Sequence, residues 1–296
     1  MSISTGTQTS TSQSLAPQRM QCMEVWGGNV ETNRALEMPG LRVWISSNAY
    51  GSAEQGGDVY YISACASGRI TRFLLADISG HGQEVAQTAV RLRDLMRKNV
   101  NVVKQRRLVQ AMNEQFASVT ADGRFATALV CTYFQPTHSF QWSNAGHPPP
   151  FLFRHKEQAW SILQSKESDA GDIPLGIDES TGFSVSKVKL QPGDLVVCYS
   201  DAFNESLSPQ GSVIGVRGLF DVVSHLNQPP DKLIAAIETE LKKLNEDNLS
   251  TDDATMAVLQ AVPGRTSLKD NLLAALRVLR PANDATRFRT SPPPAE

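Results

Sequence analysis

The sequence lacks the features that mark membrane, secreted and nucleic-acid-binding proteins. No apolar run approaches the roughly 18 residues needed to cross a bilayer. The N-terminus MSISTGTQTSTSQS has neither the charged nor the apolar region of a secretory signal. The 28 Lys and Arg residues are balanced by 30 Asp and Glu residues, whereas a nucleic-acid binder usually carries a basic excess. We therefore expect a cytoplasmic protein that neither inserts into a membrane nor binds nucleic acid.

Cysteine is also scarce. The 296-residue chain has four Cys residues, which lie far apart and form no CxxC pair. This spacing predicts neither a disulfide framework nor a zinc site. We expect the thiols to be small buried groups in a reducing compartment.

Two polar tails and a central domain are indicated by composition. Residues 1–20 are rich in Ser, Thr and Gln, and residues 281–296 read PANDATRFRTSPPPAE. Such segments bury too little apolar surface to offset their ordering entropy, so we expect both to be disordered. The domain is expected at 21–262 and an accessory helix at 263–280. Leucines at helical spacing over 267–280 suggest that this helix packs on the domain or serves in docking or dimer formation.

The central region reads as short strands with a few helices between them. Apolar residues at helical spacing predict helices near 85–96, 108–119 and 231–244. Short β-branched or aromatic segments bounded by turn residues predict strands at 41–47, 59–65, 70–78, 126–134, 139–143, 151–154, 183–190, 194–199 and 255–262. Strands and helices do not alternate regularly, which argues against a doubly wound parallel sheet. We expect an α+β fold of two mostly antiparallel sheets with helices outside.

Asp residues recur at the tips of these apolar strands. Asp58 opens a strand after a Gly pair, Asp77 and Asp201 each end one, and Asp252 and Asp253 open the last. Any one of them alone is more simply a turn or cap residue. Several in one domain suggest that the strand ends converge, and clustered carboxylates call for cations or raised pKa values. Without Cys or His ligands nearby, oxygen ligands favour Mg²⁺ or Mn²⁺, and four charges would balance two such ions.

Seven segments occur in an order that resembles a known family: GGDVYY, LLADISGHG, FATALVCTYF, WSNAGHPPPFLF, IPLGI, LQPGDLVVCYSDAFNES and DDATMAVLQ. Over about residues 40–262 the chain is similar to the bacterial metal-dependent serine/threonine phosphatases of the type 2C-like class. The nearer branch is that of stage II sporulation protein E and the sigma-factor regulator phosphatases. The resemblance implies a four-layer α-β-β-α sandwich with two metal ions between the sheets at one end. It also implies hydrolysis of phosphoserine or phosphothreonine on a protein, often an anti-sigma-factor antagonist.

The resemblance also implies which residues bind the two Mn²⁺ or Mg²⁺ ions. Asp58 would bridge both ions. The other ligands would be the carboxylate of Asp77, the backbone carbonyl of Ile78, and the carboxylates of Asp201 and of either Asp252 or Asp253, of which we favour Asp252. Two divalent ions would lower the pKa of a shared water and neutralise charge on the phosphoryl oxygens. No CxxxxxR motif indicates a covalent cysteine nucleophile.

Three further positions near these segments need a role. His81 is a candidate acid for the leaving group, and the alternative is that it structures its loop. His147 is expected to fix the turn before the Pro run through a buried hydrogen bond. Ala202 stands where the family pattern TDGxxE has Gly, and a positive φ there would cost Ala on the order of 1 kcal/mol.

Two other functions compete with an active protein phosphatase. A catalytically degenerate phosphatase fold would bind a phosphoprotein or a regulator without turnover. A two-metal hydrolase of the same chemistry would act on a small phosphoester instead of a protein. Retention of all four strand-tip acids argues for the active phosphatase, because such acids are costly to keep without metal.

Overall fold

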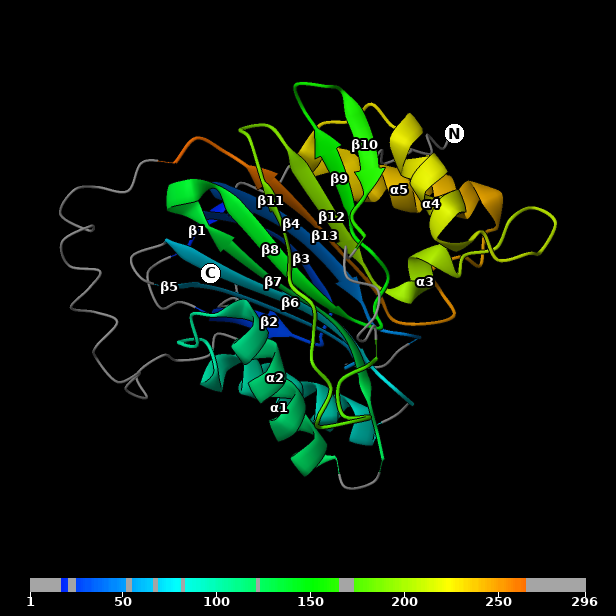
Figure 1. The fold of residues 1–296 in the computed structure, drawn as a ribbon. Helices are drawn as coiled ribbons and strands as arrows, with labels where there is room; N and C mark the ends of the chain where they lie inside the picture. Colours follow the sequence, from blue (N-terminus) through cyan, green and yellow to red (C-terminus); the bar gives the residue numbers. More distant parts are fainter. Residues whose placement is uncertain are drawn as a thin grey trace, which may run out of the picture.

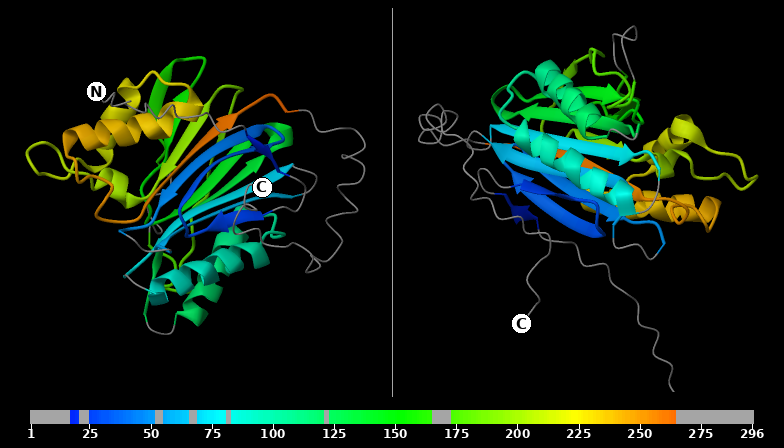
Figure 2. Two further views of the ribbon diagram at one scale, coloured as in Figure 1. Left: turned by 180° about the vertical axis from the view of Figure 1, so that it is seen from behind. Right: turned by 90° about the horizontal axis from the view of Figure 1, so that it is seen from below.

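A computed structural model describes residues 17–20, 25–51, 55–65, 69–80, 83–120, 123–164 and 173–264. Within these residues two β-sheets lie face to face, and helices cover the outer face of each (Figure 1). The views from behind and from below show the same four layers (Figure 2). The predicted α+β sandwich of two mostly antiparallel sheets is therefore confirmed.

The first sheet has seven strands among the described residues. Only its first two strands pair in parallel, and every other pair is antiparallel. In spatial order the strands are β1 (Gln18–Arg19), β3 (Thr32–Met38), β4 (Leu41–Asn48), β13 (Ala254–Ala261), β12 (Leu195–Tyr199), β9 (Phe151–Arg154) and β10 (Ala159–Ile162).

The second sheet has six described strands, and all of its pairs are antiparallel. In spatial order they are β11 (Ser186–Lys189), β8 (Ser139–Ala145), β7 (Ala126–Phe134), β6 (Ile70–Ile78), β5 (Asp58–Cys65) and β2 (Val25–Gly28). A 3₁₀ turn, η1 (Gln135–Thr137), follows β7.

The helices divide between the two outer faces. Helices α1 (Gln83–Lys98) and α2 (Gln105–Val119) pack on the six-stranded sheet. Helices α4 (Gly215–His225) and α5 (Pro230–Leu244) pack on the seven-stranded sheet, and the short α3 (Asp201–Asn204) follows β12 directly. None of the described helices is long and apolar enough to cross a membrane.

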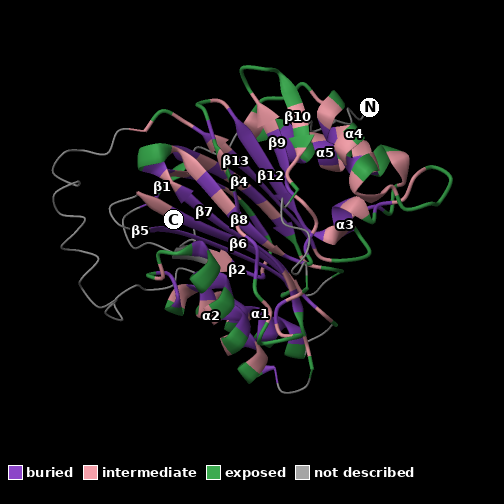
Figure 3. Cartoon of the chain, in the orientation of Figure 1, coloured by how far each residue is buried: buried purple, intermediate pink, exposed green. Residues whose placement is uncertain are grey.

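The central strands are buried on both faces, which explains their nearly continuous apolar sequences. In β6, Phe73 and Leu75 lie in the core between the sheets, whereas Leu74 and Ala76 pack toward α1 and α2. Figure 3 shows the buried strands and the exposed outer sides of the helices. The alternation of side chains along each strand therefore decides which residues face the space between the sheets.

The structure differs from the sequence prediction mainly near the N-terminus and around α4. Strands β2 and β3 and helices α3 and α4 were not predicted. Gln18 and Arg19, which fall in the predicted tail, pair with β3, and Met20 is buried. The predicted accessory helix over 267–280 and most of both tails lie outside the described residues.

Candidate metal centre

Two of the predicted ligands face each other on the six-stranded sheet. Asp58, the first residue of β5, pairs directly with Asp77 near the end of β6. Cross-strand partners project from the same face of a sheet. Tyr60 and Leu75, two residues further along the same strands, lie in the core between the sheets. Both carboxylates therefore point into the space between the sheets, at its edge.

The other predicted ligands come from the facing sheet. Asp201 follows β12 at the start of α3, and Asp252 lies just before β13. The two strands are antiparallel neighbours, with Tyr199 opposite Met256. The backbone N–H of Ser200 donates to the carbonyl of Thr255 at 2.9 Å. These contacts bring the end of β12 and the start of β13 together.

The pKa values show that the carboxylates of the two sheets lie close enough to repel one another. Burial, followed by the charges of Asp201 and Asp252, raises the pKa of Asp77 to about 8. Burial raises the pKa of Asp58 well above its ordinary value, and the charge of Asp77 adds to the increase. Burial and the nearby Glu205 raise the pKa of Asp201 to about 6. Four acidic strand ends thus share one region, and a cation bound there would relieve their repulsion.

Asp253 makes different contacts from Asp252. Its carboxylate accepts hydrogen bonds from the backbone N–H groups of Tyr50 at 2.6 Å, of Gly57, and more weakly of Asp58 at 3.4 Å. A Cβ on Gly56 would lie 2.5 Å from this carboxyl group, so only Gly fits there. Asp253 thus anchors the loop that leads into Asp58, whereas Asp252 accepts the N–H of Asp253 at 2.8 Å.

The same loop passes close to two of the predicted oxygen ligands. A Cβ on Gly57 would lie 3.3 Å from both Asp77 Oδ1 and the Ile78 carbonyl oxygen. These two oxygens therefore approach the same side of Gly57. The buried Asn29, which the sequence analysis did not identify, holds the loop by donating from Nδ2 to the Gly56 carbonyl at 3.0 Å.

The donor set fits a hard divalent cation. The Oδ2 atom of Asp58 is buried without a hydrogen-bond partner, and a bound cation would satisfy it. In the part of the chain that the structure describes, no group of three or more Asp, Glu, His or Cys side chains is arranged so that it could by itself hold a metal ion. Mg²⁺ and similar ions usually retain several waters and bind through one or two carboxylates. An open site completed by water and the Ile78 carbonyl therefore suits these residues.

The structure tests the prediction for only one of the two histidines named from the sequence. His81 lies outside the described residues, so its role as an acid stays a prediction. The turn at His147 is fixed by the side chain of Asn144, which accepts from the His147 N–H and donates to its carbonyl, both at 2.7 Å. The imidazole of His147 instead makes a 2.9 Å contact with Thr127 Oγ1. The turn therefore depends on the backbone of His147, and its ring is available for another role.

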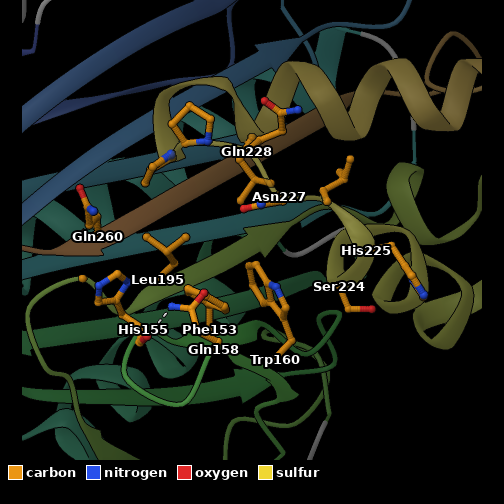
Figure 4. Close-up of a pocket in the computed structure, with 15 residues that line it drawn as sticks. Phe153, His155, Gln158, Trp160, Leu195, Ser224, His225, Asn227, Gln228 and Gln260 are labelled. Atoms are coloured by element: carbon orange, nitrogen blue, oxygen red, sulfur yellow. Dashed lines mark hydrogen bonds between the residues drawn. The ribbon is translucent and has the colours of Figure 1, made fainter.

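A separate cavity of about 480 Å³ lies between the β9–β10 hairpin and the segment joining α4 to α5 (Figure 4). Leu195, the first residue of β12, lines this cavity, whereas Asp201 lies two residues after the last residue of the same strand. His155 and His225 lie at different ends of it, with Trp160 between them. The cavity is therefore distant from the carboxylates along the sheet.

Two antiparallel sheets with helices on both outer faces give the chain the fold of the PP2C-type phosphatases. The family model of stage II sporulation protein E (SpoIIE) matches residues 67–262, which is more than half of the chain. The chain therefore belongs to the SpoIIE family, as the resemblance noted in the sequence implies.

Two curated relatives each match about half of this chain. Phosphoserine phosphatase RsbU of Bacillus subtilis is 26% identical over 136 residues, which cover 46% of this chain and 39% of RsbU. Protein IcfG of Synechocystis is 24% identical over 149 residues, which cover 50% of this chain and 23% of IcfG. The chain thus matches less than half the length of either relative.

Two solved structures support the fold assignment. The RsbU and RsbW domains of Rv1364c from Mycobacterium tuberculosis match with a TM-score of 0.62 and 22% identity, over 83% of this chain and 64% of that one. The PP2C phosphatase domain of SpoIIE from Bacillus subtilis, with a fragment of its regulatory domain, gives a TM-score of 0.62 and 18% identity, over 81% and 64%. At these identities the likeness concerns the fold alone.

Proposed function

We propose that this protein hydrolyses phosphoserine or phosphothreonine on a protein substrate, with two Mn²⁺ or Mg²⁺ ions bound between the sheets. The observation that carries the proposal is the cluster of acidic strand ends, whose pKa values are raised by burial and mutual repulsion. The ions would be held by Asp58, Asp77, Asp201 and Asp252 and by the carbonyl of Ile78. Membership of the SpoIIE family and the likeness to RsbU support a phosphatase.

The residues around the cluster have distinct tasks in this proposal. Asp253 and Asn29 hold the Gly56-Gly57 loop, which places Asp58 opposite Asp77. We choose Asp252 over Asp253 as a ligand because Asp253 already accepts several backbone N–H groups. Bound divalent ions supply an activated water for attack on phosphorus and neutralise charge on the phosphoryl oxygens. The substrate phosphate needs no cysteine nucleophile in this scheme.

The protein substrate is proposed by analogy with the relatives. RsbU is described as a phosphoserine phosphatase, and we propose a phosphorylated signalling protein, such as an anti-sigma-factor antagonist, for this chain. A cytoplasmic location stays a prediction. A dimer or docking role of residues 267–280 also stays a prediction, because that segment lies outside the described residues.

The Ala in place of the family Gly gives the degenerate alternative little support. Ala202 is not among the described residues with positive φ, and it lies inside α3 with a largely buried side chain. The conformational cost considered for Ala at this position therefore does not arise. A phosphatase without activity would have to lose function elsewhere in the cluster.

The test is release of phosphate from p-nitrophenyl phosphate and from phosphoserine peptides, with Mn²⁺ or with a chelator. The proposal predicts Mn²⁺-dependent turnover that is lost in Asp58→Asn and kept in Asp221→Asn, which changes an exposed residue of α4. Turnover that survives the chelator contradicts the metal mechanism. Turnover of the small ester alone favours the small-phosphoester hydrolase, and Mn²⁺ binding without any turnover favours the degenerate fold.

A further inference from the structure

We infer that His147 is a positioning residue, whose buried imidazole links the two sheets beneath the carboxylate cluster. This inference rests on the proposed function, because it concerns the spacing of the carboxylates that would bind the metal ions. The expected role of His147 concerned only the turn before the Pro run. Its ring contacts Thr127 and Tyr199, which lie close to Asp77 and Asp201, and these contacts give it the positioning role.

One side of the ring contacts the six-stranded sheet next to Asp77. The Nδ1 atom of His147 lies 2.9 Å from Thr127 Oγ1. Thr127 on β7 is the direct cross-strand partner of Asp77 on β6. Their side chains therefore project from the same face of the sheet as neighbours. The imidazole is thus one residue away from the Asp58–Asp77 pair.

The other side of the ring faces the seven-stranded sheet. The backbone of Tyr199 interacts with the His147 ring, and Tyr199 is the last residue of β12. Two residues later the chain reaches Asp201. The Nε2 atom is buried and has no hydrogen-bond partner among the described residues. The ring therefore reaches from the partner of Asp77 to the strand end that carries Asp201.

The chemistry of a neutral imidazole suits this bridge. Burial lowers the pKa of His147 to about 3, so the ring is uncharged at neutral pH. A neutral imidazole offers one N–H donor and one acceptor nitrogen. With its N–H on Nε2, the ring leaves Nδ1 to accept from the Thr127 hydroxyl. This tautomer is assigned from the neighbouring groups.

The backbone that carries the ring is also held in place by hydrogen bonds. The Asn144 side chain makes two hydrogen bonds of 2.7 Å to the backbone of His147, and the side chain of His147 is almost fully buried. Three Pro residues follow at 148–150. Because its backbone is held in this way, the ring can set the separation of the two strand ends that it touches.

A second contact between a hydroxyl group of β7 and a histidine ring provides a matched control. Near the far end of β7, Tyr133 Oη lies 2.9 Å from His138 Nδ1. This contact has the same length and the same type of partners as the Thr127–His147 contact. The residue opposite Tyr133 on β6 is Thr71, which is not an acid. Loss of either hydroxyl removes one contact to histidine, but only Thr127 is next to the cluster.

The experiment is a calorimetric Mn²⁺ titration of five folded apo-proteins: wild type, His147→Phe, Thr127→Val, the double variant with both of these changes, and Tyr133→Phe. Removing an outer-shell partner typically costs 10–100-fold in metal affinity. We expect a loss on the order of 10-fold or more in His147→Phe and a smaller one in Thr127→Val. Affinity should be unchanged in Tyr133→Phe. In the double variant the two losses should not add, because both changes break one connection.

Thermal unfolding in chelator separates positioning from a purely structural role. If His147→Phe and Thr127→Val lower the melting temperature but bind Mn²⁺ as tightly as wild type, the inference is wrong. If His147→Phe does not fold, Thr127→Val decides, since it removes only a hydroxyl. If the wild type binds Mn²⁺ and releases phosphate while all variants match it, only this inference fails. A wild type that binds no Mn²⁺ overturns the proposed function together with it.

Discussion

Replacing Asp77 by Asn should stabilise the metal-free protein, because the acidic cluster is repulsive without its cations. Burial and the neighbouring carboxylates raise the pKa of Asp77 from 3.8 to about 8. Between these two pH values the folded state binds a proton that the unfolded state does not bind. Stability therefore falls as the pH rises from 3.8 toward 8. Asn keeps the shape of the side chain and removes this dependence.

The size of the effect follows from the linkage between protonation and stability. Each pH unit between the pKa of the unfolded state and that of the folded state changes the free energy of unfolding by about 1.4 kcal/mol. At pH 7 an isolated group with these two pKa values would lower the free energy of unfolding by about 4 kcal/mol. Asp77 is only partly buried and shares its repulsion with Asp201 and Asp252. Solvent screening and this sharing reduce the expected gain in Asp77→Asn to about 1–3 kcal/mol. At pH 5 the gain should be less than half as large.

The assay is urea unfolding in chelator at pH 5 and pH 7, repeated with Mn²⁺. In chelator at pH 7, Asp77→Asn should unfold at higher urea than wild type, and the difference should shrink at pH 5. With Mn²⁺ the order should reverse, because only wild type gains binding energy. The reasoning is refuted if Asp77→Asn is the less stable protein in chelator at pH 7. It is also refuted if the difference between the two proteins does not depend on pH.

Three further changes test other parts of the structure. Asp253→Asn should destabilise the apo-protein by about 2 kcal/mol in the same urea assay, because it weakens hydrogen bonds to several backbone N–H groups. If Asp253→Asn instead stabilises the apo-protein as Asp77→Asn should, Asp253 belongs among the metal ligands. Gly56→Ala should weaken Mn²⁺ binding about 10-fold in calorimetry, because the new Cβ meets the Asp253 carboxyl group, whereas Gly182→Ala, in open space, should not. Arg72→Ala should cost about 3 kcal/mol or more in urea unfolding, since Arg72 is buried and bonds to Thr132, Gln105 and the Val102 carbonyl; unchanged stability would show that these bonds contribute little.

The strands and helices that the sequence predicts well are those whose pattern reflects burial. The bounds of β6, β7 and β9 agree with the prediction at both ends, because turn residues flank apolar, β-branched runs. Strand β3 (TNRALEM) consists largely of good helix formers. It is a strand because all seven of its residues pair with β4. The pairing runs across the Pro39-Gly40 turn and overrides the helical propensity of these residues.

Helix α4 was missed for a related reason. Its sequence GVRGLFDVVSH contains two Gly residues, and no side chain caps its start. Its stability comes from Leu219 and Val223, which pack into the core against the seven-stranded sheet. Helices that depend on packing rather than on propensity are poorly visible in a single sequence.

The sequence predicts the acidic residues of the candidate site but not the residues that hold them in place. Asp at the tip of an apolar strand is unusual, and Asp58, Asp77 and Asp201 each show that pattern. The contrast between Asp252 and Asp253 depends on a loop almost 200 residues away in the sequence. Asn29 is a single Asn with no motif around it, so only the folded chain shows that it holds the Gly56 carbonyl.

The most direct test of the metal centre is the position of Mn²⁺ in crystals of the protein, located by anomalous scattering. The account predicts two anomalous peaks between the sheets, bounded by Asp58, Asp77, Asp201 and Asp252, and no peak in crystals of Asp58→Asn. Crystals without a peak at these carboxylates, or with Mn²⁺ bound only at His155 or His225 in the distant cavity, would contradict it.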